Sequence, residues 1–320
     1  MPGRGTRDGH AVTGALRQAA AGYLQTRRSL GYRLQAHGRL LMSYIAGLEA
    51  SGQTTVTAAN AVAWATRPAG ASAVWHSRRL PVARCFARYL SVTDPSCQVP
   101  PAWLLPARYS RRAPYIYTQQ QIDALIHAAG TLGSPLLAAS CQAVISLLAS
   151  TGMRIGEALA LTRADTDLER GIITVINGKH GASRHVPLHQ SVTQMLRRYS
   201  ARRDRLCPAP GSDRFFLTRA GTPLSPGQLQ DAFARLLVHA GITVPAGQRS
   251  PRIHDLRHAF AVMTIRDWYR DGADVQARLP VLSTMPGHIA PAHTYWYLTA
   301  TPDLLAIAAQ RLHDHLGDLP

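Results

Sequence analysis

A dense run of prolines divides the chain into two parts. Five of the 21 prolines in its 320 residues fall between positions 95 and 114. Proline fixes φ and has no N–H to donate, so prolines at this density stop helices and hold the backbone extended. We therefore predict a basic linker over residues 99–116, between an N-terminal domain of residues 1–98 and a second domain of residues 117–320.

The N-terminal domain is expected to be all helical. Its apolar residues recur at intervals of three and four, which is the spacing of one buried helix face. Thr57 is a good N-cap because its hydroxyl can accept a hydrogen bond from the first helical turn. The predicted helices span residues 11–30, 39–51, 57–64 and 73–92.

The second domain combines helices with one extended stretch. After Asp167 the apolar period changes, which predicts strands over 172–177 and 184–189, joined by a glycine-flanked loop. Thr118 is expected to cap the first helix. The fold class is therefore mainly α with a small β-sheet. The predicted helices span residues 119–129, 136–149, a segment from about residue 153, 191–203, 225–240, 251–270, 292–300 and 302–316.

The net charge points to a polyanionic partner. The chain has 35 basic and 18 acidic residues, a formal charge of +17 and a pI near 10.8. Residues 1–113 hold 15 arginines and 3 acids, a balance of 15 − 3 = +12. An arginine-rich codon bias would scatter solvated charges, but it would not explain this shortage of acids. A folded surface that binds nucleic acid is the better interpretation.

The only lysine of the chain, Lys179, lies in the loop between the two predicted strands. The other 34 basic residues are arginines. Arginine stays protonated, whereas lysine can give up a proton. Lys179 is thus a candidate proton donor. Composition alone is equally compatible with a lysine that remains by chance in a chain biased toward arginine.

One predicted helix start gathers groups that suit a phosphate. Ser250 and Pro251 have the residue types preferred at N-cap and N1, so a helix is expected from there. His254 and Arg257 would then share one face in the first turns. Free N–H groups and the helix dipole favour an anion at this position.

Another predicted helix start carries an arginine and an acid. Arg154 follows the turn at Ser150-Thr151-Gly152, and Glu157 comes three residues later. Glu157 could hold Arg154 or another cation in one rotamer. Taken alone, the pair could equally be a surface ion pair of little energetic weight.

A histidine and a tyrosine near the C-terminus complete the set. Tyr297 follows His288 of a Gly-His pair by 297 − 288 = 9 residues. Tyr295 is a rival two positions away, and on a helix the two side chains would point in different directions. The spacing from His288 favours Tyr297.

Taken in order, these segments resemble the tyrosine recombinase family, also called the phage integrase family. The resemblance rests on TGMRIGEALAL, SRHVPLH, RIHDLRHAFAV and TYWYLTATPDLL, and it spans residues 23–312. One such motif is weak, but several in order at compatible spacing are specific. The segments look closest to integrases and transposases of bacterial mobile elements. The family fold implies a helical core-binding (SAM-like) domain followed by an α+β catalytic domain.

The resemblance implies a reaction that exchanges a DNA phosphodiester for a phosphotyrosine. Tyr297 would attack the scissile phosphate and leave a 3′-phosphotyrosyl link. Lys179 would protonate the departing 5′-oxygen. Arg154 and Arg257 would grip the phosphate and stabilise its transition state.

Two histidines and an acid complete the implied site. His254 would donate a hydrogen bond to the phosphate and help to accept the tyrosine proton. His288 fills the second His/Trp position of the family, and Glu157 matches an acid that supports the site structurally. Pro286 departs from the apolar residue that usually precedes Gly-His, and it would shorten the preceding helix.

The resemblance also implies the partners. They are double-stranded DNA with specific recombination sites, further copies of the chain in a homotetramer on DNA, and accessory DNA-bending proteins. We expect no cofactor and no metal, since none of the four cysteines forms a C-x-x-C pair. No apolar run reaches the ~18 residues of a membrane span, so a cytoplasmic, nucleoid-associated bacterial protein is expected. The expected DNA contacts are Arg27, Arg28, Arg78, Arg79, Arg111 and Arg112.

Three other functions fit the sequence less well. A catalytically inactive DNA-binding protein of the same fold would not need competent residues at all six active-site positions. A type IB topoisomerase-like enzyme that nicks and reseals strands shares the chemistry, but the basic helical first domain favours recombination. A metalloenzyme that uses His180, His185 and His189 rests on their clustering around the hairpin alone.

Overall fold

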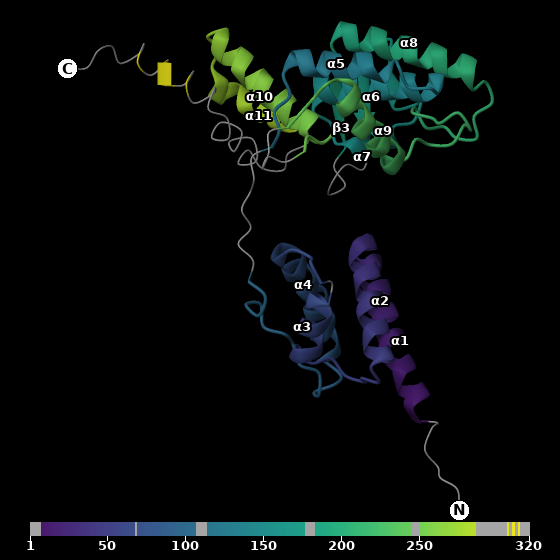
Figure 1. Ribbon diagram of the computed structural model, residues 1–320, viewed down its shortest axis with the longest axis vertical. Coiled ribbons are helices and arrows are strands. Elements are labelled where there is room, and N and C mark those ends of the chain that lie inside the picture. The colour runs from purple at the N-terminus through teal and green to yellow at the C-terminus, as the bar shows by residue number, and fades with distance from the viewer. Residues whose placement is uncertain are drawn as a thin grey trace, which may run out of the picture. The chain divides into compact units, whose positions relative to one another are not determined.

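The chain divides into two compact units, Met1–Arg111 and Arg112–Pro320. The computed structural model (Figure 1) describes residues 8–67, 69–106, 114–176, 183–244 and 250–285, with residues 306, 309, 310 and 313. Those last four are helical and lie within the predicted helix 302–316. Several predictions fall outside the described residues, namely those on Arg111, Arg112, Lys179, His180, Pro286, His288, Tyr295, Tyr297 and the helix 292–300.

The described part of the first unit is helical, as predicted. Thr57 caps its helix: the Thr57 hydroxyl accepts from Asn60 N at 3.1 Å, and the Asn60 side chain accepts from Thr57 N at 3.0 Å. The second helix begins earlier than predicted, after Leu34 in a left-handed conformation (φ 44°) and without a side-chain cap that sequence could reveal. The helices are α1 (Asp8–Ser29), α2 (Gln35–Ala50), α3 (Ala58–Thr66) and α4 (Ala73–Leu90).

The core of the first unit lies between these helices. Tyr44 and Trp64 are buried with ring centroids 4.9 Å apart, and the Tyr44 hydroxyl donates to Asn60 Oδ1 at 2.6 Å. The core extends beyond residue 98, because Leu104 and Leu105 pack against it. The expected linker 99–116 therefore begins with residues that belong to the first core, and residues 107–113 lie outside the description.

The second unit is built around one helix that is buried along most of its length. That helix, α6 (Pro135–Thr151), packs against helices on several sides (Figure 1) and ends at Gly152 in a left-handed conformation. A helix that is apolar on all sides must lie inside the protein. The other helices are α5 (Gln119–Ala129), α7 (Ile155–Ala160), α8 (Gln190–Leu206), α9 (Pro226–His239), α10 (Asp255–Arg270) and α11 (Val275–Thr284).

The predicted hairpin is present as two strands of a small antiparallel sheet. Strand β2 (Ile172–Val175) pairs with β3 (Arg184–Pro187), with Val175 opposite Arg184. A two-residue strand, β1 (Thr166–Asp167), adds to β2 and gives the order β1-β2-β3. It is too short to show an alternating pattern in the sequence. The hairpin loop, residues 177–182, lies outside the description.

No range was predicted for helix α11, although a helix was expected before Pro286. It contains Pro280, which sequence rules count against a helix interior, yet Asp274 caps it by accepting from Ala277 N at 3.1 Å. Its apolar face packs with α10 in a separate small cluster that includes Ile265, Leu279 and Leu282. This helix ends at Thr284, immediately before Met285 and Pro286.

Candidate active site

Arg257 connects helix α10 to the end of helix α6. It is 4% exposed, and its Nη1 donates to the backbone oxygen of Gly152 at 2.7 Å. Gly152 has a φ of 61°, and a Cβ built there would lie 2.5 Å from Phe260 Cδ1. Only glycine tolerates both this conformation and this contact. Gly152 thus lets α10 approach closely enough for Arg257 to bond the end of α6.

The start of α10 differs from the prediction. The helix begins at Asp255, so the expected N-cap at Ser250 and N1 position at Pro251 are wrong. Asp255 is 1% exposed and accepts hydrogen bonds from Arg252 N at 2.8 Å and Arg252 Nη2 at 3.1 Å. The Tyr117 hydroxyl also donates to the Arg252 backbone oxygen at 3.2 Å. These bonds hold residues 250–253 in a non-helical turn. The Ser-Pro pair that is typical of a helix start therefore does not begin the helix.

His254 takes the N-cap position of α10, although its side chain makes no capping hydrogen bond. The imidazole is half-buried, with its ring centroid 5.3 Å from that of His258. Burial lowers the pKa of His254, and the positive charges of Arg257, Arg252 and Arg154 lower it further, against the opposite effect of Asp255. These surroundings therefore favour the neutral form of His254, and Arg154 and Arg257 lie within electrostatic reach of it.

Arg154 is held by Glu157, as the sequence suggested. Arg154 precedes α7, and its Nη1 donates to Glu157 Oε1 at 2.8 Å while its backbone N donates to Oε2 at 3.2 Å. The Glu157 side chain is only 9% exposed. The pair is therefore not the solvated surface ion pair that the sequence alone left open.

Sequence reasoning missed the second partner of Glu157, which is Arg184 at the start of β3. Its Nη2 lies 2.7 Å from Glu157 Oε2, and its Nε donates to the Met285 backbone oxygen at 3.0 Å. Burial raises the pKa of Glu157, but hydrogen bonds and charge from Arg184 and Arg154 outweigh it, so the pKa lies below its usual range. The motif SRHVPLH contains Arg184, but one arginine among 34 gives no signal by itself.

The predicted DNA contacts in the first unit fall into two groups. Arg79 is 8% exposed, donates to the Trp64 backbone oxygen at 2.9 Å and lies 4.1 Å from the Trp64 ring centroid. These interactions occupy Arg79 inside the unit, and its role as a DNA contact stays a prediction. Arg27 is half-buried and lies 4.2 Å from the Tyr32 ring centroid, whereas Arg28 and Arg78 are exposed.

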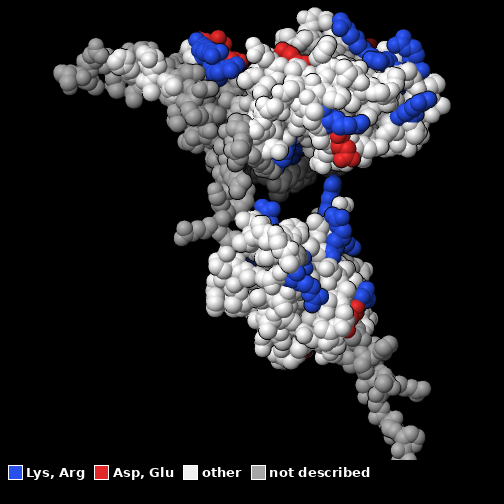
Figure 2. Space-filling model, in the orientation of Figure 1, with Lys and Arg blue, Asp and Glu red and all other residues white. Residues whose placement is uncertain are grey.

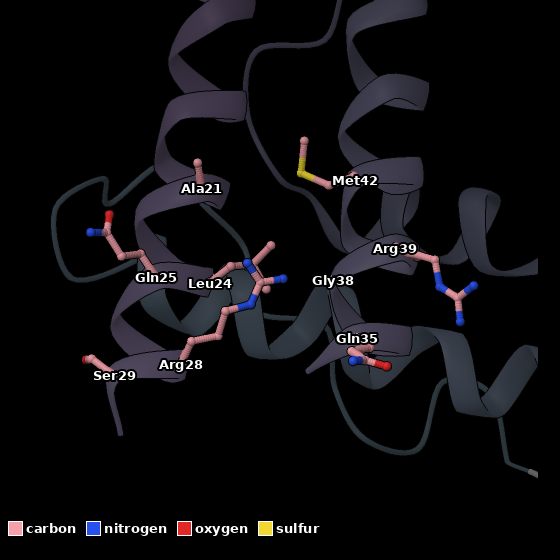
Figure 3. Close-up of a pocket in the computed structure, with 9 residues that line it drawn as sticks. All are labelled: Ala21, Leu24, Gln25, Arg28, Ser29, Gln35, Gly38, Arg39 and Met42. Atoms are coloured by element: carbon pink, nitrogen blue, oxygen red, sulfur yellow. The ribbon is translucent and has the colours of Figure 1, made fainter. Parts of the chain in front are cut away.

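A cavity of about 820 Å³ opens between α1 and α2 (Figure 3). Arg28 and Arg39 contribute charge to its lining, and Arg28 reaches across to α2 at Gly38, where a Cβ would lie 3.3 Å from Arg28 Nη2. Figure 2 shows basic side chains over the visible face of this unit with little acidic surface between them. The unit therefore presents positive charge at its exterior.

The histidines near the hairpin do not form a metal site within the described residues. His185 Nδ1 lies 3.2 Å from the Thr174 hydroxyl, and His189 caps α8 through Ser191. No group of three or more His, Cys, Asp or Glu side chains there could hold a metal ion. Likewise, none of the helices described is both long and apolar enough to cross a membrane.

Comparisons with known proteins identify the family. The model of the phage integrase family matches residues 116–303. A protein of Sinorhizobium fredii that carries the name integrase/recombinase y4rB is 38% identical over 310 residues, covering 94% of this chain and 98% of the relative. Tyrosine recombinase XerC of Lactobacillus delbrueckii is 28% identical over 203 residues, covering 63% of this chain and 65% of the relative.

The solved structures agree with this fold. The Tn1549 transposon integrase, in complex with a circular intermediate DNA, matches with a TM-score of 0.64 at 17% identity, over 93% of this chain and 99% of that one. The chain therefore belongs to the phage integrase family. It is a tyrosine recombinase, an enzyme that cuts and rejoins DNA strands.

Proposed function

We propose that this protein recombines double-stranded DNA at specific sites, with Arg154, His254 and Arg257 forming the pocket for the scissile phosphate. The observation that carries this proposal is that packing brings Arg154, which precedes α7, and Arg257, in the first turn of α10, within electrostatic reach of His254. Two guanidinium groups and an imidazole at helix N-termini suit an anion with several oxygens.

The proposed chemistry uses Tyr297 as the nucleophile. Its oxygen attacks phosphorus, the 5′-oxygen leaves with a proton from Lys179, and a 3′-phosphotyrosyl bond replaces the phosphodiester. One ester bond is exchanged for another, so the step needs no ATP, and we propose that it needs no metal or other cofactor. Positioned cations supply the stabilisation of the transition state, where one donor is typically worth about 10²–10³ in rate.

His254 and His288 have the complementary roles. The lowered pKa of His254 favours its neutral imidazole, the form that can accept the proton of the attacking tyrosine. His288 would contact the phosphate or orient the nucleophile. Glu157 contributes by holding Arg154 in place.

Duplex DNA is the proposed partner of both units. The excess of arginine in residues 1–113 and the exposed side chains of Arg28 and Arg78 support contacts to phosphates, and Arg27, Arg111 and Arg112 remain candidates for the same role. The solved relatives include XerH bound to its palindromic difH substrate. We further propose a homotetramer on DNA, accessory DNA-bending proteins, and a nucleoid-associated location in bacterial cytoplasm.

The test requires a substrate, which selection from a random-sequence duplex library by binding to the full chain would provide. A nick placed within the selected site lets the cleaved fragment leave, so that a covalent adduct accumulates and can be trapped by denaturation. We expect an adduct with the wild type and with Tyr295→Phe. Tyr297→Phe should bind the same duplex with unchanged affinity and form no adduct.

The other outcomes would point to a different nucleophile or to a different function. An adduct with Tyr297→Phe would show that another residue is the nucleophile. Binding without an adduct in the wild type would favour the inactive DNA-binding protein. Relaxation of supercoiled DNA without recombinant products would favour the topoisomerase-like alternative.

A further inference from the structure

Arg184 joins three segments that are far apart in the sequence. Its guanidinium faces Glu157 with both terminal nitrogens, Nη2 at 2.7 Å from Oε2 and Nη1 at 3.4 Å from Oε1. Its third donor, Nε, bonds the backbone oxygen of Met285 at 3.0 Å. The side chain is 16% exposed. One residue of β3 therefore connects the first turn of α7 to the end of α11.

The sharing of Glu157 determines where Arg154 can lie. Arg154 Nη1 bonds Oε1 and Arg184 Nη2 bonds Oε2, so each oxygen of the buried carboxylate has a guanidinium partner. Without Arg184, Oε2 would lose its strongest donor. The carboxylate would then turn toward Arg154 or take up a proton, and both changes would displace the Arg154 guanidinium.

We propose that Arg184 is a positioning residue of the recombinase reaction, which acts on Arg154 through Glu157 and ties the active-site end of α7 to the residue that follows α11. This inference rests on the proposed role of Arg154 at the phosphate. It gives Arg184 no contact with the reacting atoms.

The geometry requires an arginine at this position. A planar guanidinium can direct two nitrogens at one carboxylate and a third at a backbone oxygen, whereas an ammonium is a single point of charge. The strand context matters as well, since Arg184 pairs with Val175 across the hairpin and is held in place by the sheet. A lysine there would keep the charge but lose the connection between α7 and α11.

The first experiment measures Glu157 directly and needs no DNA. The chain contains three glutamates, Glu49, Glu157 and Glu169, so selective ¹³C labelling of their carboxyl carbons gives three signals, and Glu157→Gln assigns one of them. In the wild type, the Glu157 signal should titrate below the usual value of about 4.3. In Arg184→Gln it should titrate at higher pH than in the wild type. An unchanged titration would overturn the proposal, whatever the function of the protein.

The second experiment measures reaction with the nicked duplex, after the wild type has been shown to form its adduct. Arg184→Gln should slow adduct formation by about 10-fold to 100-fold, the scale of a misplaced catalytic group. Its affinity for the duplex should change less than about twofold, which separates positioning from binding. Arg184→Lys should not restore the rate, and full restoration would overturn the requirement for a guanidinium.

A double-mutant cycle tests the route through Glu157. If Arg184 acts through this carboxylate, the double variant Arg184→Gln/Glu157→Gln should react no more slowly than Glu157→Gln alone. Additive losses would overturn the proposal. The matched control is Arg163→Gln, which removes an arginine paired with Asp204 at the surface of the same unit and should react at the wild-type rate. A wild type without an adduct would refute the proposed function instead, while the titration would still test Arg184.

Discussion

The two units use arginine in different ways. In the second unit, carboxylates hold arginines in fixed positions: Glu157 contacts Arg154 and Arg184, and Asp204 contacts Arg163 and Arg203. In residues 1–113 there are 3 acids for 15 arginines, so most of these arginines cannot pair with a carboxylate of the same segment. A guanidinium paired with a carboxylate has a defined geometry, as chemistry requires, whereas a surplus of exposed positive charge gives a broad positive potential that attracts DNA.

Both units bury arginine, and a comparison of Arg79 in the first with Arg257 in the second shows that burial alone does not indicate function. Arg79 and Arg257 are both under 10% exposed, and each donates to a backbone oxygen. Arg79 stacks on Trp64 and stays within the helical core. Arg257 lies at a helix start and acts electrostatically on His254, as Arg154 does. The surroundings distinguish a structural arginine from a candidate catalytic one.

The largest expected effect comes from replacing Arg257 by methionine, and the same replacement of Arg79 serves as the comparison. Arg257→Met should slow adduct formation by about 10²–10³-fold, because a donor to the transition state is lost. Arg79→Met should leave the rate of the folded enzyme unchanged and lower the free energy of unfolding by about 1–3 kcal/mol, because the Trp64 oxygen loses its hydrogen bond from the charged guanidinium and keeps the longer one from Arg67 N. Adduct kinetics and thermal unfolding measure the two effects. Equal losses of rate would remove the distinction between the units.

A smaller effect is expected from two glycines with nearly the same backbone conformation. Gly152 in the second unit has a φ of 61° and Gly52 in the first a φ of 65°, but a Cβ would clash with Phe260 only at position 152. Both alanine variants should lose about 1 kcal/mol from left-handed strain. Gly152→Ala should lose about 1–3 kcal/mol more from overpacking. Denaturant unfolding checks this, and equal losses would mean that α10 moves away without cost.

The smallest effect concerns the salt dependence of DNA binding. Arg28→Gln and Arg78→Gln should each lower the log–log slope of affinity against salt by about 0.9, as expected for one lost phosphate contact. Arg163→Gln in the second unit should leave the slope unchanged, because the Arg163 guanidinium is already engaged in an ion pair with Asp204. Fluorescence anisotropy with a labelled duplex over a range of salt concentrations measures all three. A fall in slope with Arg163→Gln would place DNA on that surface too.

Local signals predicted much of the fold. The helix 119–129 and its cap at Thr118 agree with α5, and the predicted helix 225–240 corresponds to α9, which Ser225 caps. These helices have a capping side chain three residues before its partner, so a short window contains the whole signal. The prediction was wrong at the start of α10 and gave no range for α11, where Asp255 and Pro280 act against the usual local rules.

The sequence by itself determined the chemistry available to this protein. The motifs around Arg154, His254 and Arg257 identify the family, because the types of side chain and their order are properties of the chain alone. Only the tertiary structure decided which partners these groups have. Arg184 contacts Glu157, which is 27 residues away in the sequence, and Met285, which is 101 residues away. Arg257 contacts Gly152, which is 105 residues away. Such contacts depend on how buried helices and a strand pack together, which no local pattern encodes.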